Sequence, residues 1–108
     1  MTDTIVVFMT AANADEARRI ANHLVESRLA ACVQILPEIE SVYRWQGEVQ
    51  REREVLMLAK TTASQFDELE KAVRGIHSYD TAEIIAVPAS AISEPYLRWL
   101  MMEVQLSS

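Results

Sequence analysis

The residues best suited to chemistry lie together in HSYDTAEIIAVP, residues 77–88. This stretch places His77, Tyr79, Asp80 and Glu83 within seven positions, directly ahead of an apolar run. Imidazole and carboxylate groups serve as metal ligands and as acid–base catalysts. A turn leading into a strand explains the same residues, because His77 would follow a helix end and aspartate is a common turn residue. The stretch by itself leaves both interpretations open.

A metal site would need further donors from elsewhere in the chain. Cys32 and His23 are available, but no CxxC, HxxxH or HExxH spacing accompanies them. Cys32 lies in an apolar segment, where a buried thiol without a metal is the commoner outcome, and His23 lies beside an apolar helical stripe. We predict His77, Glu83 and Cys32 as metal ligands, with a plain turn and a buried thiol as the alternative.

Motifs of common enzymes are absent from the sequence, which has no GxSxG and only two glycines in all. Glu52 and Glu54 share one face of a predicted strand, where two carboxylates could act as acid and base. The adjacent arginines favour a solvated charge ladder instead. Lys60, near a strand end, is either an anion anchor or a solvated side chain. We predict that the protein is not an enzyme.

Length and composition favour one domain covering residues 1–108, since half of the residues are hydrophobic. The longest uncharged apolar stretches, 4–14 and 29–37, are shorter than the roughly 18 residues that a membrane span needs. The net charge of −6 and the scattered arginines disfavour nucleic acid as a partner. No basic residue precedes Arg18 and Cys32 is the single cysteine, so we expect a cytoplasmic protein without a signal peptide.

The hydrophobic pattern predicts the order β, α, β, β, α, β followed by a C-terminal helix. A capping box of Asn13 and Glu16 opens the first helix, and Thr62 caps the second. The predicted elements are a strand at 4–10, a helix at 14–28, a hairpin across 29–61, a helix through 76, a strand at 82–88 and a helix from Ser93. This is the ferredoxin-like α+β sandwich, a fold that does not name a function.

Gln46 and Gly47 form the predicted tip of the hairpin. A two-residue turn there places Trp45 opposite Glu48 and Glu40 opposite Arg53, and the opposite charges of the second pair favour this register.

Each arm of this hairpin could hold about 14 residues and reach about 46 Å, whereas the radius of gyration expected for 108 residues is near 13 Å. The hairpin would then project beyond its own domain and expose Tyr43, Trp45 and unpaired strand edges. Another copy of the chain is the simplest cover, so we predict a symmetric oligomer. A bulge or bend that folds the arms back is the alternative.

Six sequence blocks follow one another over nearly the whole chain: VVFMTA, LAACVQILP, SVYRWQG, LMLAKT, HSYDTAEIIAVP and YLRWL. In these blocks the chain resembles the CutA family of divalent-cation tolerance proteins. The resemblance implies a trimer of ferredoxin-like protomers, similar in architecture to PII signal transducers, with clefts between subunits. It also implies a protein without established enzymatic activity, linked in bacteria to copper tolerance and copper binding.

The copper-binding pattern of some bacterial relatives falls on Met9, Ile76 and His77, of which only His77 keeps the family's residue type. Residues that match the recurrent family pattern are expected at clefts or subunit interfaces; besides the three predicted metal ligands they include Gln34, Tyr43, Trp45, Glu52, Glu54, Lys60, Tyr79 and Trp99. We expect copper or another divalent cation to bind in such clefts. A PII-like sensor or scaffold, binding a small anion near Lys60, is the alternative.

Overall fold

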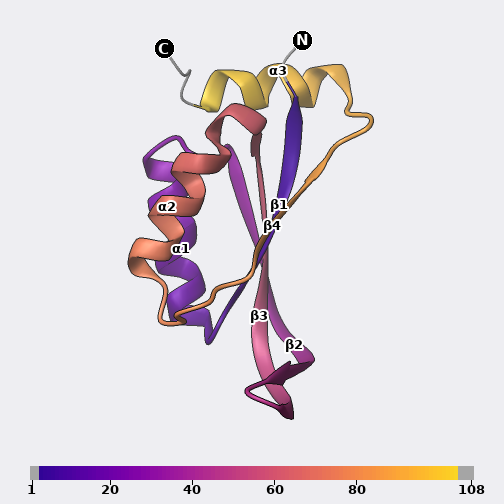
Figure 1. The fold of residues 1–108 in the computed structure, drawn as a ribbon. Helices are drawn as coiled ribbons and strands as arrows, with labels where there is room; N and C mark the ends of the chain where they lie inside the picture. Colours follow the sequence, from indigo (N-terminus) through magenta and orange to yellow (C-terminus); the bar gives the residue numbers. More distant parts are fainter. Residues whose placement is uncertain (1–2, 105–108) are drawn as a thin grey trace.

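The computed structural model describes residues 3–104 and shows a four-stranded antiparallel sheet with two helices on one face (Figure 1). The strands lie in the order β2-β3-β1-β4, which is the ferredoxin-like arrangement. The elements are β1 (Thr4–Ala11), α1 (Ala14–Glu26), β2 (Cys32–Trp45), β3 (Glu48–Thr62), a 3-10 turn (Ala63–Gln65), α2 (Phe66–Ile76), β4 (Ile84–Pro88) and α3 (Glu94–Glu103). The predicted order of strands and helices is confirmed.

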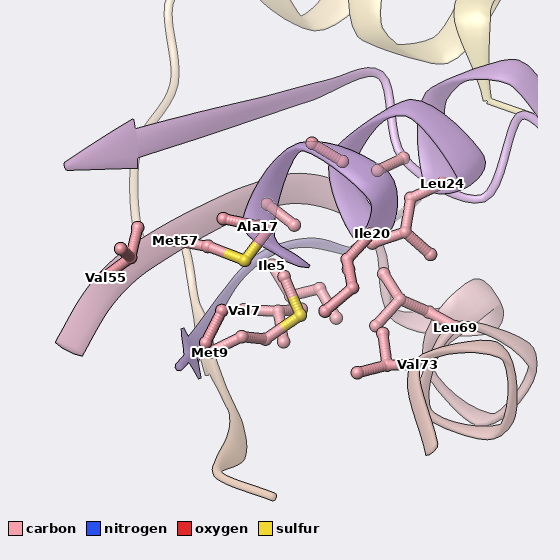
Figure 2. Packing of buried hydrophobic residues seen from close by; sticks show 14 residues of the cluster. Ile5, Val7, Met9, Ala17, Ile20, Leu24, Val55, Met57, Leu69 and Val73 are labelled. Carbon is pink, nitrogen blue, oxygen red and sulfur yellow. The ribbon is translucent and has the colours of Figure 1, made fainter. Parts of the chain in front are cut away.

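The sequence of β1 is apolar on both faces because this strand is central, paired with β3 on one side and β4 on the other. Its odd-numbered residues, such as Val7 and Met9, point into the core. There they meet Ile20 of α1 and Leu69 of α2 (Figure 2). One sheet face and two helices thus enclose the main core.

Helix α1 begins at the predicted cap, where the Asn13 side chain accepts a hydrogen bond from the Glu16 amide at 2.8 Å. It ends at Glu26, two residues before the predicted end, because Arg28 takes a left-handed φ of 61° and turns the chain. Val25, expected on the buried stripe, is 43% exposed.

Two predicted boundaries after the hairpin need correction. The Thr62 side chain does not cap α2: its hydroxyl pairs with that of Ser64, and a 3-10 turn comes first. Strand β4 begins at Ile84 instead of residue 82, since it pairs with β1 only from the Ile84–Met9 pair onward.

The hairpin has the predicted register, with Trp45 opposite Glu48 and Glu40 opposite Arg53. Gln46 and Gly47 have φ values of 50° and 82°, the left-handed conformation that a two-residue type I′ turn requires at both positions. A bulge between Leu36 and Ile39 shifts the pairing of β2.

This bulge does not fold the hairpin back onto the domain. Strand β1 pairs with β3 only from Val55 to Thr62, so residues 48–54 pair with β2 alone and form a two-stranded ribbon. The ribbon projects beyond α1 and α2 (Figure 1). The molecule measures 44 × 26 × 22 Å with a radius of gyration of 14.4 Å, above the value of about 13 Å for a compact chain of this length.

The second face of the sheet carries apolar side chains that α1 and α2 do not cover. We call this surface the open face; its apolar residues, identified by strand alternation and register, are Val6, Phe8, Leu36, Leu56, Leu58, Ile85 and Val87. Ile85 is 56% exposed.

Helix α3 lies across one end of the sheet (Figure 1). Its Leu100 is buried with Ala31 and Val104. The Arg28 guanidinium donates hydrogen bonds to the carbonyls of Met102 and Glu103, which holds the C-terminal turn of the helix in place. Within residues 3–104, no helix is both long and apolar enough to cross a membrane.

The hairpin tip yields a stability prediction. Gln46 holds a conformation that asparagine adopts more readily and a β-branched residue adopts poorly. We expect Gln46→Asn to raise the free energy of unfolding by roughly 0.5–1 kcal/mol and Gln46→Val to lower it by about 1 kcal/mol. Denaturant unfolding at one fixed protein concentration measures both, and equal values for the two variants would contradict the turn assignment.

Candidate functional site

The loop between α2 and β4 meets the sheet at the point where the ribbon begins. Ala11 of β1 pairs with Val55 and is the last partner that β1 offers to β3. Glu54 is therefore the first residue of β3 without a β1 neighbour, and Tyr79 of the loop contacts it instead. We call this region the ribbon junction, comprising Glu16, Glu52, Glu54, His77, Tyr79 and Glu83.

Both ring nitrogens of His77 are engaged by the backbone. Nε2 lies 2.6 Å from the Thr10 carbonyl oxygen, and Nδ1 lies 3.0 Å from the Tyr79 amide nitrogen. A carbonyl can only accept and an amide N–H can only donate, so Nε2 carries the proton and Nδ1 carries none. The side chain has no exposed surface. The imidazole is a neutral group joining the end of β1 to the loop after α2.

Glu16 is a buried carboxylate that bridges two segments of the chain. One oxygen accepts the Ala12 amide at 2.9 Å, and the other accepts the Ser78 amide at 2.7 Å. Burial disfavours its charge, but these hydrogen bonds outweigh that penalty, so the pKa of Glu16 lies below its usual value. The same residue therefore supports the start of α1 and the loop that follows α2.

Two tyrosine hydroxyls donate to carboxylates on β3. Tyr79 reaches Glu54 at 2.9 Å, and Tyr43 reaches Glu52 at 2.6 Å. Burial and the bond to Glu54 raise the pKa of Tyr79, while the bond to Glu52 raises the pKa of Tyr43 to about 12. Both phenols therefore stay protonated donors at neutral pH.

Glu83 is a further carboxylate at the junction, close enough to Glu54 for the two charges to interact. Partial desolvation raises the pKa of Glu83, and the neighbouring Glu54 charge raises it further. The nearby arginines are directed elsewhere: Arg51 and Arg53 pair with glutamates of β2 on the opposite face of the ribbon. The junction thus presents carboxylate oxygens, which are ligands for hard divalent cations.

A second group of predicted residues lies at the other end of the sheet. The Lys60 ammonium donates to the Gln34 side chain at 2.6 Å, and Lys60 pairs with Cys32 across the two strands. Helix α3 adds Tyr96 and Trp99, whose ring centroids lie 5.4 Å apart. Burial, with the adjacent Cys32, raises the pKa of Tyr96. Trp45 belongs to neither group and is 48% exposed beside the hairpin tip.

The three predicted metal ligands do not converge within one protomer. Cys32 pairs with Lys60, six residues along β3 from Glu54, a distance of about 20 Å. His77 and Glu83 lie at the Glu54 end. Across residues 3–104, no group of three or more His, Cys, Asp or Glu side chains is arranged to hold a metal ion. Cys32 is therefore far from His77 and Glu83 within one chain, and the assignment of these three residues as metal ligands stays a prediction.

The sequence pattern predicts only one of the two roles that Glu16 has in the structure. Its spacing from Asn13 predicts a capping role, and the cap is present, although the carboxylate takes the Ala12 amide instead of the Asn13 amide. Its second partner, the Ser78 amide, is a backbone group 62 residues away, and no residue type marks such a contact.

The strand order and helix placement define a ferredoxin-like α+β protein, and the comparisons with known proteins agree. A family model described as "CutA1 divalent ion tolerance protein" matches residues 5–103. The "Divalent-cation tolerance protein CutA" of Thermus thermophilus is 47% identical over 95 residues, covering 88% of this chain and 92% of that protein. This chain belongs to the CutA1 divalent ion tolerance family.

Plant and archaeal relatives extend the similarity. The chloroplastic CutA of Arabidopsis thaliana is 44% identical over 90% of this chain, which spans about half (53%) of that protein. The crystal structure of CutA1 from Oryza sativa is 41% identical and superposes with a TM-score of 0.94, covering 97% of this chain and 96% of that one. A CutA structure from Archaeoglobus fulgidus, described as periplasmic, is 35% identical with a TM-score of 0.92, covering 94% and 99% of the two chains.

The buried Glu16 carboxylate predicts a pH-dependent contribution to stability. Its pKa is lowered on folding, so its contribution is present above the unfolded value of 4.5 and is lost as pH falls through the folded value. We expect Glu16→Gln to lower the free energy of unfolding by about 1–3 kcal/mol at neutral pH, and the deficit to shrink below pH 4.5. Denaturant unfolding over this range measures it, with the exposed Glu26→Gln on the same helix as control. A deficit that does not change with pH would contradict this role.

Proposed function

We propose that this chain is a divalent-cation tolerance protein that acts without catalysis. It works as a homotrimer and binds copper or another divalent cation in clefts between its subunits. Family membership supports the tolerance function, since relatives carry that name. The acidic ribbon junction is the observation that carries the metal-binding part.

The junction favours a cation for electrostatic reasons. The raised pKa of Glu83 reflects lost hydration and repulsion from Glu54, which are two costs that a bound cation would offset. Tyr79 and Tyr43 already donate to Glu54 and Glu52, so these carboxylates are held in place. At the junction, β3 has no β1 neighbour beyond Val55, which leaves room for a neighbouring subunit. That subunit could add further metal ligands, including Cys32 from the far end of its own sheet.

The open face and the ribbon support the oligomer. The open face exposes apolar side chains, and residues 48–54 leave one strand edge without a partner. Both features are normally covered in a stable protein. A closed symmetric assembly of identical chains covers them without a second protein.

Assembly is tested by light scattering and by one pair of variants. We expect a trimer at micromolar concentration, and Ile85→Lys on the open face to dissociate it because a charge would be buried at the contact. Val25→Lys is the control, since Val25 is also exposed but lies on α1, on the helical side of the sheet. A monomeric wild type, or an Ile85→Lys trimer as stable as the control, would reject the assembly.

Metal binding is tested by calorimetry on metal-stripped protein with Cu(II), Cu(I) and Zn(II). We expect Glu83→Gln to weaken binding at least about tenfold, because it removes a charged oxygen donor. The exposed Glu68→Gln on α2 is the matched control. Binding should weaken as pH falls through the raised pKa of Glu83, since protons compete for the ligand. Equal affinities for the two variants would remove Glu83 from the site.

Lys60 favours one alternative, a PII-like sensor or scaffold for a small anion. In the part of the chain that the structure describes, its ammonium contacts the neutral Gln34 and forms no ion pair. Its charge is therefore available to an anion at the Cys32 end of the sheet, where α3 contributes Tyr96. A thermal-shift screen with nucleotides and small carboxylates tests this function, and no stabilisation by any of them would count against it.

We place the protein in the cytoplasm because the free thiol of Cys32 suits a reducing compartment. Cell fractionation tests this, and recovery from the periplasm would contradict it.

A further inference from the structure

We propose that Glu16 and His77 form a clamp that positions Tyr79 against Glu54, and that His77 acts on the ribbon junction through this clamp and not as a metal ligand. The clamp itself stands on the geometry of one chain. Its effect on cation binding rests on the proposed function.

The residues at the copper-binding positions of some relatives do not fit copper in this chain. Met9 is fully buried among the apolar side chains of the core (Figure 2). The Ile76 side chain has no atom that can bind a metal. His77 has no exposed surface, and each ring nitrogen already has a backbone partner. A metal at the imidazole would have to displace one of these partners and leave a buried polar group unsatisfied.

The two side chains of the clamp accept hydrogen bonds from two consecutive backbone amides of the loop. The Ser78 amide donates to the Glu16 carboxylate, and the Tyr79 amide donates to Nδ1 of His77. The other carboxylate oxygen of Glu16 accepts from the Ala12 amide, and Nε2 of His77 donates to the Thr10 carbonyl. Both of these partners lie at the end of β1. The loop is thereby joined to β1 and to the start of α1.

The direction of Tyr79 follows from this attachment. Its backbone is fixed at the amide, and its ring lies against the His77 ring, with centroids 4.7 Å apart and planes inclined by 45°. The hydroxyl then reaches Glu54 at 2.9 Å, at the first position of β3 beyond the pairing with β1. The hydrogen bonds from Glu16 and His77 to the loop therefore direct the Tyr79 phenol toward the Glu54 carboxylate.

The first test reads the imidazole in the unaltered protein, so it needs no variant to fold. Nitrogen-15 NMR of His77 should show Nε2 protonated and Nδ1 as a bare acceptor, and this pattern should persist when zinc is added to saturation. Loss of the Nε2 proton, or a metal-induced shift of either nitrogen resonance, would overturn the proposal.

The second test compares His77→Gln with His77→Ala. A glutamine amide can replace the Nε2–H donor to Thr10 but is a poor metal ligand. We expect His77→Ala to lower zinc affinity by about tenfold or more, as for residues that orient a metal ligand, and His77→Gln to recover most of that loss. Equal and complete loss in both variants would instead identify a ligand.

A third measurement separates failure of the clamp from failure of the proposed function. We expect the Ser78 and Tyr79 amides to exchange with solvent at least tenfold faster in Glu16→Ala than in the wild type. The Ser78 amide loses its acceptor, and the loop that holds the Tyr79 amide against His77 loses one of its two attachments. The Tyr79 hydroxyl resonance should broaden or disappear in the same variant. If the wild type binds no metal, these two readouts still decide the clamp. Unchanged exchange and an unchanged hydroxyl signal would reject it.

Discussion

The difference in length between the hairpin strands and the central strand determines much of this structure. Strand β1 has 8 residues, whereas β2 and β3 have 14 and 15. The helices can cover only the part of the sheet that β1 completes, so the rest of the hairpin becomes an exposed ribbon. Backbone groups along its free edge, and Glu54 at its base, then need partners from outside the regular sheet.

The ribbon junction follows from the same constraint. Where β1 ends, the loop after α2 contributes the Tyr79 side chain as a partner for Glu54, and no backbone ladder continues there. The alternation of β3 sends Arg51 and Arg53 to one face and Glu52 and Glu54 to the other. Since the arginines are paired with β2 glutamates, the junction face keeps its negative charge.

The sequence was most informative wherever the signal was local. The Glu40–Arg53 pair and the Gln46–Gly47 tip predicted the register correctly, because cross-strand pairs and turn conformation depend on neighbouring residues. The predicted start of β4 is wrong by two residues, since it depends on where pairing with the distant strand β1 begins.

The candidate site was harder to predict for a physical reason. Its main contacts join side chains to backbone amides and carbonyls of distant segments, as Glu16 does with Ser78 and His77 with Thr10. Every non-proline residue carries an amide donor and every residue a carbonyl acceptor, so such a partner leaves no mark in the residue types. The side chains at the junction were therefore recognisable from the sequence, but their roles were not.

His77 and Glu83 belong to the same sequence motif and were both predicted as metal ligands, but their surroundings in the structure differ. The imidazole is buried and has both nitrogens satisfied, so a metal at either nitrogen would leave a backbone partner without its hydrogen bond. The Glu83 carboxylate is crowded by Glu54 and partly desolvated, so a cation relieves an existing cost. Under the proposed function, which of these residues serves as a cation ligand therefore depends on whether its donor atoms are already satisfied within the chain, and residue type alone does not reveal that.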